Sequence, residues 1–176
     1  MAMLVYAMNL SLDGYVDHLR MRPDAALFAH WTDYVASLAG CIYGRHVYQI
    51  MQYWDEDQPG WGDQERAYAA VWRRQRKWVV SRTLAAVGPN ATLLTGDLET
   101  AIRALKAGND GELSVSGPAI AQSLGDLGLI DEYRLYYHPV VMGHGTPFFA
   151  GSPPPLRVIG SDRIGPETVR LAYEPV

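Results

Sequence analysis

The sequence has a single cysteine among its 176 residues, and this excludes a disulfide within the chain. Cys41 stands in an apolar run with Ile42 and Tyr43, which is typical of a small buried side chain in a reducing compartment. No apolar run approaches the ~18 residues of a membrane span, and no basic segment precedes the first apolar run, as it would in a secretory signal. These absences predict a cytoplasmic protein with no membrane partner.

Long runs of one charge are also missing, since 15 Lys and Arg face 19 Asp and Glu for a net charge of −4. The one basic cluster, residues 73–77, follows a helical pattern and is more typical of a solvated helix end than of a nucleic-acid surface. The five histidines show no metal-ligand spacing. We therefore expect neither nucleic acid nor a metal ion as a partner.

The pattern of apolar residues predicts an α/β fold in one domain, residues 1–176. With 48% hydrophobic residues, the chain is long enough to bury a full core. Strands are predicted over 3–10, 41–43, 77–80, 92–94, 113–116, 133–142, 156–159 and 169–173. Helical patterns alternate with these strands up to about residue 131, which favours a largely parallel sheet with helices on both faces. The last two strands are expected to close the fold as an antiparallel hairpin.

Three of these strands end in residues suited to an anion. The segments are Gly44-Arg45-His46, Ser81-Arg82-Thr83 and Ser116-Gly117-Pro118. Each alone fits ordinary turn and capping chemistry. Because the carboxyl ends of parallel strands share one edge of a sheet, together they indicate a ligand with several phosphates, such as a dinucleotide with a 2′-phosphate. The usual Gly-x-Gly-x-x-Gly and Walker loops are absent.

The order of motifs along the chain resembles that of dihydrofolate-reductase-like proteins. The matching segments are 11–16 (SLDGYV), 44–48 (GRHVY) and 79–84 (VVSRTL). The run over 128–149 resembles the riboflavin-biosynthesis reductase branch in particular, which forms the C-terminal domain of bifunctional deaminase-reductases. The resemblance implies a mixed, mostly parallel eight-stranded sheet with flanking helices and an antiparallel C-terminal strand. It also implies a homodimer.

The same resemblance implies NADPH as the cofactor. Arg45 and His46 would contact its phosphates, and Ser81 and Arg82 its 2′-phosphate, which selects NADPH over NADH. The implied cofactor-binding residues are Ala7, Gly14, Tyr15, Val16, Gly44, Arg45, His46, Val47, Ser81, Arg82, Thr83, Ser116, Gly117, Pro118, Ala119 and Ile120. Many relatives carry Gly-Gly where this chain has Ser116-Gly117, and a serine narrows backbone freedom there.

The catalytic candidates are two carboxylates, because hydride transfer needs a proton delivered to the neighbouring heteroatom. Asp24 resembles by position the substrate-binding carboxylate of dihydrofolate reductases, although its place before a helix favours an N-cap. Asp13 lies in the loop beside the expected nicotinamide and would hold the loop or the substrate. A water could also supply the proton. Trp31 and Tyr48 are candidates for stacking on a flat substrate ring, and Trp61, between two glycines, is the aromatic residue least expected in the core.

Three functional hypotheses follow. The first is a reductase that uses NADPH on a pyrimidine or pteridine, most like the 5-amino-6-ribosylamino-uracil reductase of riboflavin biosynthesis. The zinc-deaminase motif often fused to that reductase is absent, and the scarcity of basic residues in the substrate region weakens the case for a phosphorylated substrate. The second is dihydrofolate reductase, which needs a buried Asp24 facing the nicotinamide. The third is a noncatalytic NADP-binding or scaffold protein.

Overall fold

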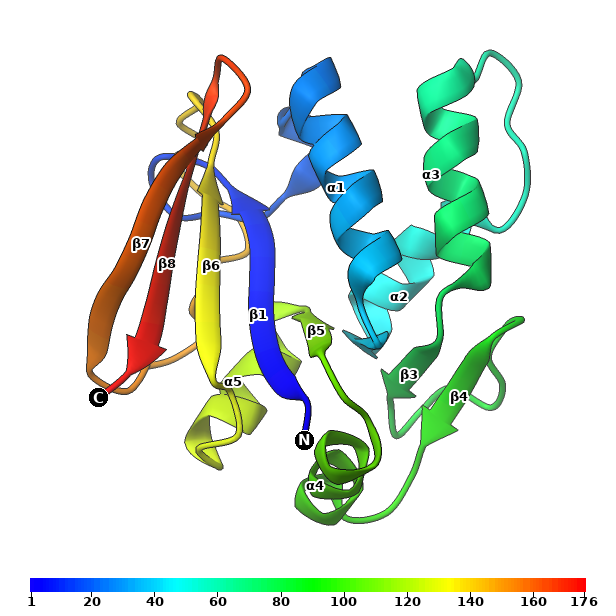
Figure 1. The fold of residues 1–176 in the computed structure, drawn as a ribbon, viewed down its shortest axis with the longest axis vertical. Coiled ribbons are helices and arrows are strands. Elements are labelled where there is room, and N and C mark those ends of the chain that lie inside the picture. Colours follow the sequence, from blue (N-terminus) through cyan, green and yellow to red (C-terminus); the bar gives the residue numbers. More distant parts are fainter.

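The computed structural model describes residues 1–176, and one mixed sheet of eight strands runs through it (Figure 1). The strands are β1 (Met3–Leu10), β2 (Gly40–Gly44), β3 (Lys77–Val80), β4 (Ala91–Leu94), β5 (Glu112–Ser116), β6 (Glu132–Tyr137), β7 (Leu156–Ile164) and β8 (Thr168–Pro175). Their order in the sheet is β4-β3-β2-β5-β1-β6-β8-β7. The first six pair in parallel, and β8 runs antiparallel to both of its neighbours. The predicted fold class is therefore confirmed.

Five helices flank the sheet. They are α1 (Ala25–Ser37), α2 (Arg45–Met51), α3 (Asp63–Arg74), α4 (Leu98–Gly108) and α5 (Pro118–Asp126). The first three gather on one side, with α1 and α3 side by side, whereas α4 and α5 lie apart from them (Figure 1). None of the helices combines the length and the apolar character that a bilayer crossing requires.

Alternation along the central strand divides the interior into two faces. Leu4, Tyr6 and Leu10 of β1 belong to the large core that also holds the buried residues of α4 and α5. Val5 and Ala7 point to the opposite face and pack beneath α1. Since side chains alternate along a strand, Asn9 shares the face of Val5 and Ala7. The α1 face therefore receives a polar side chain near the carboxyl end of the central strand.

The strand predicted over 133–142 ends earlier, at Tyr137. The next residues leave the sheet, because Pro139 has no N–H to continue a ladder and the amide of Val140 bonds back to the His138 carbonyl. The chain then crosses the end of β1, where the Leu12 amide donates to the Val140 carbonyl over 2.8 Å. Residues 138–142, which the apolar run predicted to be strand, therefore form a loop over the carboxyl edge of the sheet.

The expectation that Trp61 lies outside the core is wrong. Its side chain is buried, its ring lies 5.1 Å from that of Trp54, and its Nε1 donates to the Tyr53 hydroxyl over 2.9 Å. The flanking glycines shape the turn that carries the indole inward, and Gly60 adopts a φ of +86°. Trp61 therefore supports the aromatic residues that follow α2.

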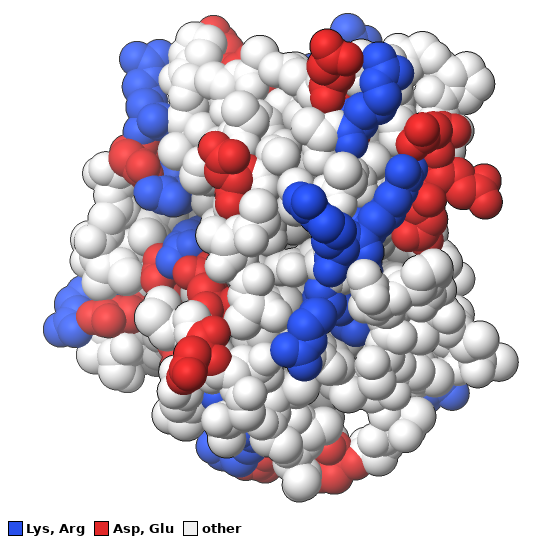
Figure 2. Space-filling model, turned by 45° about the vertical axis from the view of Figure 1, so that its right-hand side comes forward, with Lys and Arg blue, Asp and Glu red and all other residues white.

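The basic segment 73–77 joins α3 to β3. In Figure 2 the side of the molecule with α3 and β3 comes forward. It shows a group of Lys and Arg side chains beside a group of acidic side chains. Arg73 pairs with Asp57 over 2.7 Å. Lys77 is buried, and its Nζ lies over the Trp72 ring and donates to the Gln75 carbonyl. The segment is thus a partly neutralised helix end, and the expectation of full solvation is wrong for Lys77.

Candidate active site

A cavity of about 800 Å³ opens between the sheet and the helices α1, α2 and α3. This volume suits a cofactor end together with a small ligand. The sheet contributes Ala7 and Asn9 from β1, Cys41 and Tyr43 from β2, and Ser114 and Ser116 from β5. The helices contribute mainly apolar side chains, among them Phe28, Trp31 and Val35 of α1 and Val47, Ile50 and Met51 of α2.

The three anion-suited segments lie side by side along one edge of the sheet. β3, β2 and β5 are consecutive strands, with Gly44 opposite Val80 and Tyr43 opposite Ser116. Two strand spacings, or about 10 Å, therefore separate Ser81 from Ser116. The predicted convergence at one edge is confirmed, and it borders the cavity, which His46, Val47, Ser116 and Pro118 line.

Two helix N-termini meet in the middle of this edge. Neither α2, which follows Gly44, nor α5, which follows Gly117, has a side chain capping its first turn. Gly117 adopts a φ of +124°, and a Cβ there would lie 3.3 Å from the Ile120 side chain and 3.6 Å from the Gly44 amide nitrogen. The free N–H groups of both helices are therefore held close together, an arrangement that suits a pyrophosphate.

The serine that replaces a glycine of the family pattern causes no backbone strain. Asn90 is the only residue other than glycine with a positive φ, so Ser116 adopts an ordinary extended conformation as the last residue of β5. Its side chain lines the cavity. The replacement of glycine by serine narrows the backbone conformations open to residue 116. Because the backbone there is extended, this restriction does not stand against cofactor binding.

The outer part of the edge carries free polar groups. The Ser81 Oγ accepts from the amides of Thr83 and Leu84 over 3.2 and 3.1 Å, which leaves its hydroxyl proton free to be donated. Arg82 and Arg45 are exposed and take part in none of the ion pairs of the chain. Both guanidinium groups are thus available to an anionic ligand.

Asp13 ties together two loops whose later residues, such as Val16 and Thr146, line the cavity. Its carboxylate accepts from the Ser11 hydroxyl at 2.6 Å and from the amides of Met142 and Gly143 at 3.0 and 2.7 Å. These hydrogen bonds lower the pKa of Asp13 to about 2. Asp13 does not line the cavity. From the sequence, Asp13 is expected to hold either the loop or the substrate. Its hydrogen bonds are those of a residue that holds the loop.

Asp24 and Tyr48 also lie outside the cavity lining. Asp24 precedes α1, and its Oδ1 accepts from the Leu27 amide over 2.8 Å, so it caps the helix. Tyr48 is buried, and its hydroxyl accepts from the Gly88 amide over 2.7 Å. Because consecutive helical residues point about 100° apart, Tyr48 turns away from the cavity that its neighbour Val47 lines.

Trp31 does line the cavity, together with a residue that the motifs did not identify. The Trp31 Nε1 donates to the Oδ1 of Asn9 over 3.2 Å. Asn9 could have been found from the alternation of side chains along β1. It is the one polar residue on the face that also carries Val5 and Ala7.

A half-buried ionic network underlies α1 next to the cavity. Arg134 of β6 binds both carboxylate oxygens of Glu112 at 2.9 Å and reaches Glu132 at 2.7 Å. Tyr34, which lines the cavity, donates its hydroxyl hydrogen to Glu112. Burial and the Glu112 carboxylate raise the pKa of Tyr34, so its hydroxyl stays protonated. The network holds Tyr34 in place and satisfies the charges beneath the helix.

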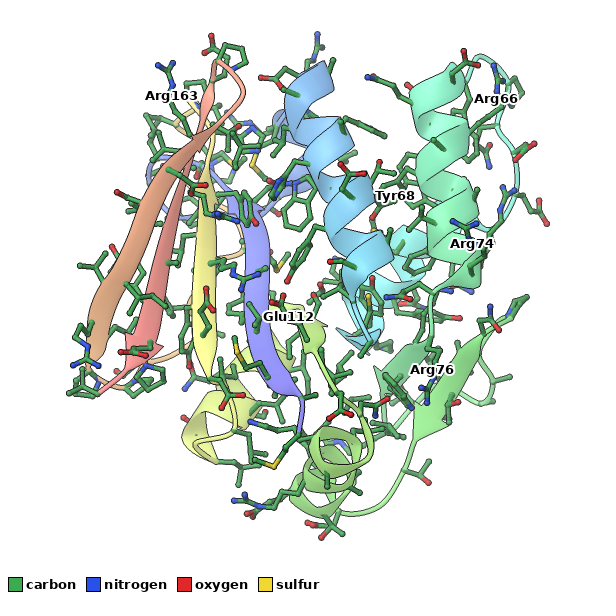
Figure 3. The ribbon with its side chains drawn as sticks, viewed as in Figure 1. Arg66, Tyr68, Arg74, Arg76, Glu112 and Arg163 are labelled. Carbon is green, nitrogen blue, oxygen red and sulfur yellow. The ribbon has the colours of Figure 1, made fainter.

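Titration of the cavity side chains argues against a nucleophile. Burial raises the pKa of Cys41 to about 11, and it also raises the pKa of Tyr43 and Tyr68. Figure 3 shows Tyr68 in the space between α3 and α1. Burial lowers the pKa of His18; Asp17 opposes this shift, and His46 adds to it. Thiol and phenols are therefore neutral at pH 7, and the site suits transfer chemistry more than covalent catalysis.

Comparison with known proteins agrees with this architecture. The family model of the RibD C-terminal domain matches residues 2–170. The uncharacterized protein YyaP of Bacillus subtilis strain 168 is 27% identical over 155 residues, which cover 83% of this chain and 79% of that protein.

Solved structures show the same fold. A putative riboflavin biosynthesis protein from Shewanella sp. PV-4 superposes with a TM-score of 0.76 at 24% identity, covering 99% of this chain and 98% of that one. A diaminohydroxyphosphoribosylaminopyrimidine deaminase/5-amino-6-(5-phosphoribosylamino)uracil reductase from Thermotoga maritima superposes with a TM-score of 0.70 at 15% identity, and this chain covers 57% of it. Since the family model spans nearly the whole length, the chain belongs to the RibD C-terminal domain family.

Proposed function

We propose that this protein is an NADPH-dependent reductase that acts on a pyrimidine- or pteridine-like ring. The observation that supports it is the row of anion-suited strand ends beside an apolar cavity. Membership in the RibD C-terminal domain family agrees, as does the uracil reductase activity after which the Thermotoga maritima protein is named. When bound, NADPH supplies the hydride.

The residues along the sheet edge would hold the phosphates of this cofactor. The N–H groups at the start of α2 and α5 would bind the pyrophosphate, with Arg45 beside them. The Ser81 hydroxyl and the Arg82 guanidinium would bind the 2′-phosphate, because a guanidinium matches phosphate geometry. The residues present therefore fit NADPH, and the outermost pair would distinguish it from NADH.

The reacting end of the cofactor would lie against β1. Ala7 lines the cavity there, and its small side chain lets a flat ring approach the strand. The surrounding apolar side chains exclude water from the reacting atoms. The only carboxylate that lines the cavity, Asp17, accepts from the Thr146 amide over 2.6 Å. We therefore assign the proton to a water that enters at the mouth.

The two alternatives lack a supporting observation. Dihydrofolate reductase requires Asp24 to face the nicotinamide, whereas Asp24 caps α1 and does not line the cavity. A noncatalytic protein with a blocked cleft is disfavoured by a cavity of about 800 Å³.

Titration of the protein with NADPH and with NADH tests the proposal. We expect NADPH to bind more tightly, and Arg45→Ala and Ser81→Ala to weaken it. A hydrogen bond to a charged group contributes about 1.5–3 kcal/mol, so each substitution should lower the affinity for NADPH on the order of tenfold or more. Arg163→Ala, on the exposed part of β7, which lies toward the opposite edge of the sheet from β2 and β3 (Figure 3), is the matched control and should bind NADPH as the unaltered protein does. If neither nucleotide binds, the protein is not a reductase of this kind.

A further inference from the structure

We propose that the part of the cavity between α1, α3 and β1 binds a flat, uncharged ring without a phosphate group, whose carbonyl oxygen accepts a hydrogen bond from Asn9. This inference rests on the proposed function, in which the cofactor takes the side of the cavity next to α2 and α5. It adds the substrate class and a residue that determines specificity.

Aromatic side chains form the wall of this part of the cavity. Phe28 comes from α1, Tyr53 and Trp54 from the turn after α2, and Tyr68 from α3. The Trp54 ring lies 6.2 Å from that of Phe28 and 4.8 Å from that of Tyr68, in edge-to-face arrangements. Tyr68 reaches into this space from α3 (Figure 3). Such a wall offers ring faces and edges to a flat aromatic ligand.

The cavity offers no cation to a phosphate group. None of its lining residues is a lysine or an arginine, and the carboxylate of Asp17 is its one permanent charge. The nearby Arg20 donates to the Met142 carbonyl over 3.0 Å, and Arg73 is held by the Trp54 carbonyl and Asp57. Arg22 lies next to the lining residue Met21, but it is exposed and does not line the cavity.

A phosphate monoester carries about −1.5 to −2 charges at pH 7. Burying it among aromatic side chains without a cation is strongly unfavourable. The charges therefore favour an uncharged ligand over a phosphorylated one.

Asn9 supplies the polar contact. The indole N–H of Trp31 is a donor only, so the atom that it meets at 3.2 Å must be the Asn9 amide oxygen. The Asn9 NH₂ group donates no hydrogen bond within the chain and lines the cavity. It lies on the same face of β1 as Ala7, about 6.5 Å farther along the strand. Trp31 thus orients Asn9 as a donor to a carbonyl oxygen, next to the position proposed for the nicotinamide.

Matched ligand pairs test the substrate class. The pairs are uridine, inosine and riboflavin, each with its 5′-monophosphate, titrated calorimetrically into the protein saturated with NADP⁺. We expect the unphosphorylated member of at least one pair to bind about tenfold or more tightly than its phosphate, since even one unpaired charge opposes burial. Tighter binding by any phosphate, or no binding by any of the six compounds, overturns the inference.

Variants of Asn9 test the specificity contact. Asn9→Asp keeps the acceptor for Trp31 but loses the donors, so the best ring ligand should bind about tenfold more weakly. Trp31→Phe keeps an aromatic ring but removes the hydrogen bond that orients the Asn9 amide. It should weaken binding of the ring ligand less than Asn9→Asp does. Gln49→Leu, on the exposed side of α2, is the control for replacing an amide. Unchanged ring binding in Asn9→Asp overturns the contact.

The NADP⁺ titration of the unaltered protein separates the two proposals. If NADP⁺ fails to bind, the proposed function fails, and the inference fails with it. If NADP⁺ binds and the ring compounds behave otherwise than expected, only the inference is overturned.

Discussion

At Gly117 the backbone conformation and the neighbouring side chains together require glycine. Its φ is +124°, and a Cβ would lie 3.3 Å from Ile120 and 3.4 Å from Val47, which line or border the proposed cofactor site. Strained backbone of this kind costs on the order of 1–3 kcal/mol. We expect Gly117→Ala to lower the free energy of unfolding by about that amount and to weaken NADPH binding, as measured by urea unfolding and by titration.

Ser116→Gly is the control for this substitution. Ser116 adopts an ordinary extended conformation, so a glycine there should cost only about 0.5–1 kcal/mol through its greater freedom in the unfolded chain. NADPH binding should persist. Equal stability of Gly117→Ala and the unaltered protein would show that the two helix termini are not held as closely as described.

His138 gives the protein a pH-dependent stability. It is buried, its Nε2 has no hydrogen-bond partner, and burial lowers its pKa, with Asp24 opposing the shift. In the unfolded chain a histidine titrates near pH 6.5, at about its ordinary value. Below about that pH the unfolded state binds a proton that the folded state does not, so the free energy of unfolding falls as the pH decreases. Above about pH 7 this contribution is constant.

The prediction is checked by urea unfolding between about pH 7.5 and 5.5. Burial also lowers the pKa of His18 and His30, so all three histidines contribute to the decline. We expect His138→Leu to reduce its slope but not to abolish it. A slope equal to that of the unaltered protein would contradict the assignment to His138.

At the scale of elements, the start of α1 decides between two roles for Asp24. Its Oδ1 caps the helix at the Leu27 amide. Because asparagine caps as well as aspartate does, Asp24→Asn should keep both the stability and NADPH binding, whereas Asp24→Ala should cost about 1 kcal/mol. Urea unfolding and NADPH titration measure both. Once a substrate is known, loss of turnover in Asp24→Asn with unchanged stability would make Asp24 a proton donor after all.

The sheet edge shows why elements had to be combined to find the site. A Gly-Arg or Ser-Arg-Thr segment by itself also fits ordinary turns. The parallel pairing of β3, β2 and β5 brings three such segments to one edge, and the alternation of strands with helices along the chain predicts a parallel sheet. The position of this edge was therefore available from the sequence.

For the whole molecule we propose a homodimer, as the resemblance to the riboflavin branch implies. β7 is an edge strand, and Val158, Ile159 and Val169 expose 59%, 48% and 42% of their surfaces on the hairpin of β7 and β8. An exposed apolar edge favours pairing with a second chain. Light scattering should give twice the mass of one chain, and Val158→Lys should lower the measured mass to that of a single chain. A monomeric unaltered protein would contradict the proposal.

Most elements of this protein, and their order, follow from local patterns in its sequence. Period-two and helical patterns located the strands and helices, and the change of pattern after about residue 131 indicated the antiparallel end. These features depend on interactions within a few residues, such as the cap at which Asp97 accepts from the Thr100 amide over 2.8 Å. Local interactions of this kind can be read from the chain.

Which side chains meet in the site depends on how the elements pack. Tyr48 and Val47 are neighbours in α2, yet only Val47 lines the cavity, because what lies opposite each depends on the packing of α1 and α3. Asn9 becomes a donor toward the cavity through Trp31, 22 residues away, and Asp13 binds amides 129 and 130 residues away. Periodicity states which face of an element a residue occupies, but the partner on that face comes from distant parts of the chain.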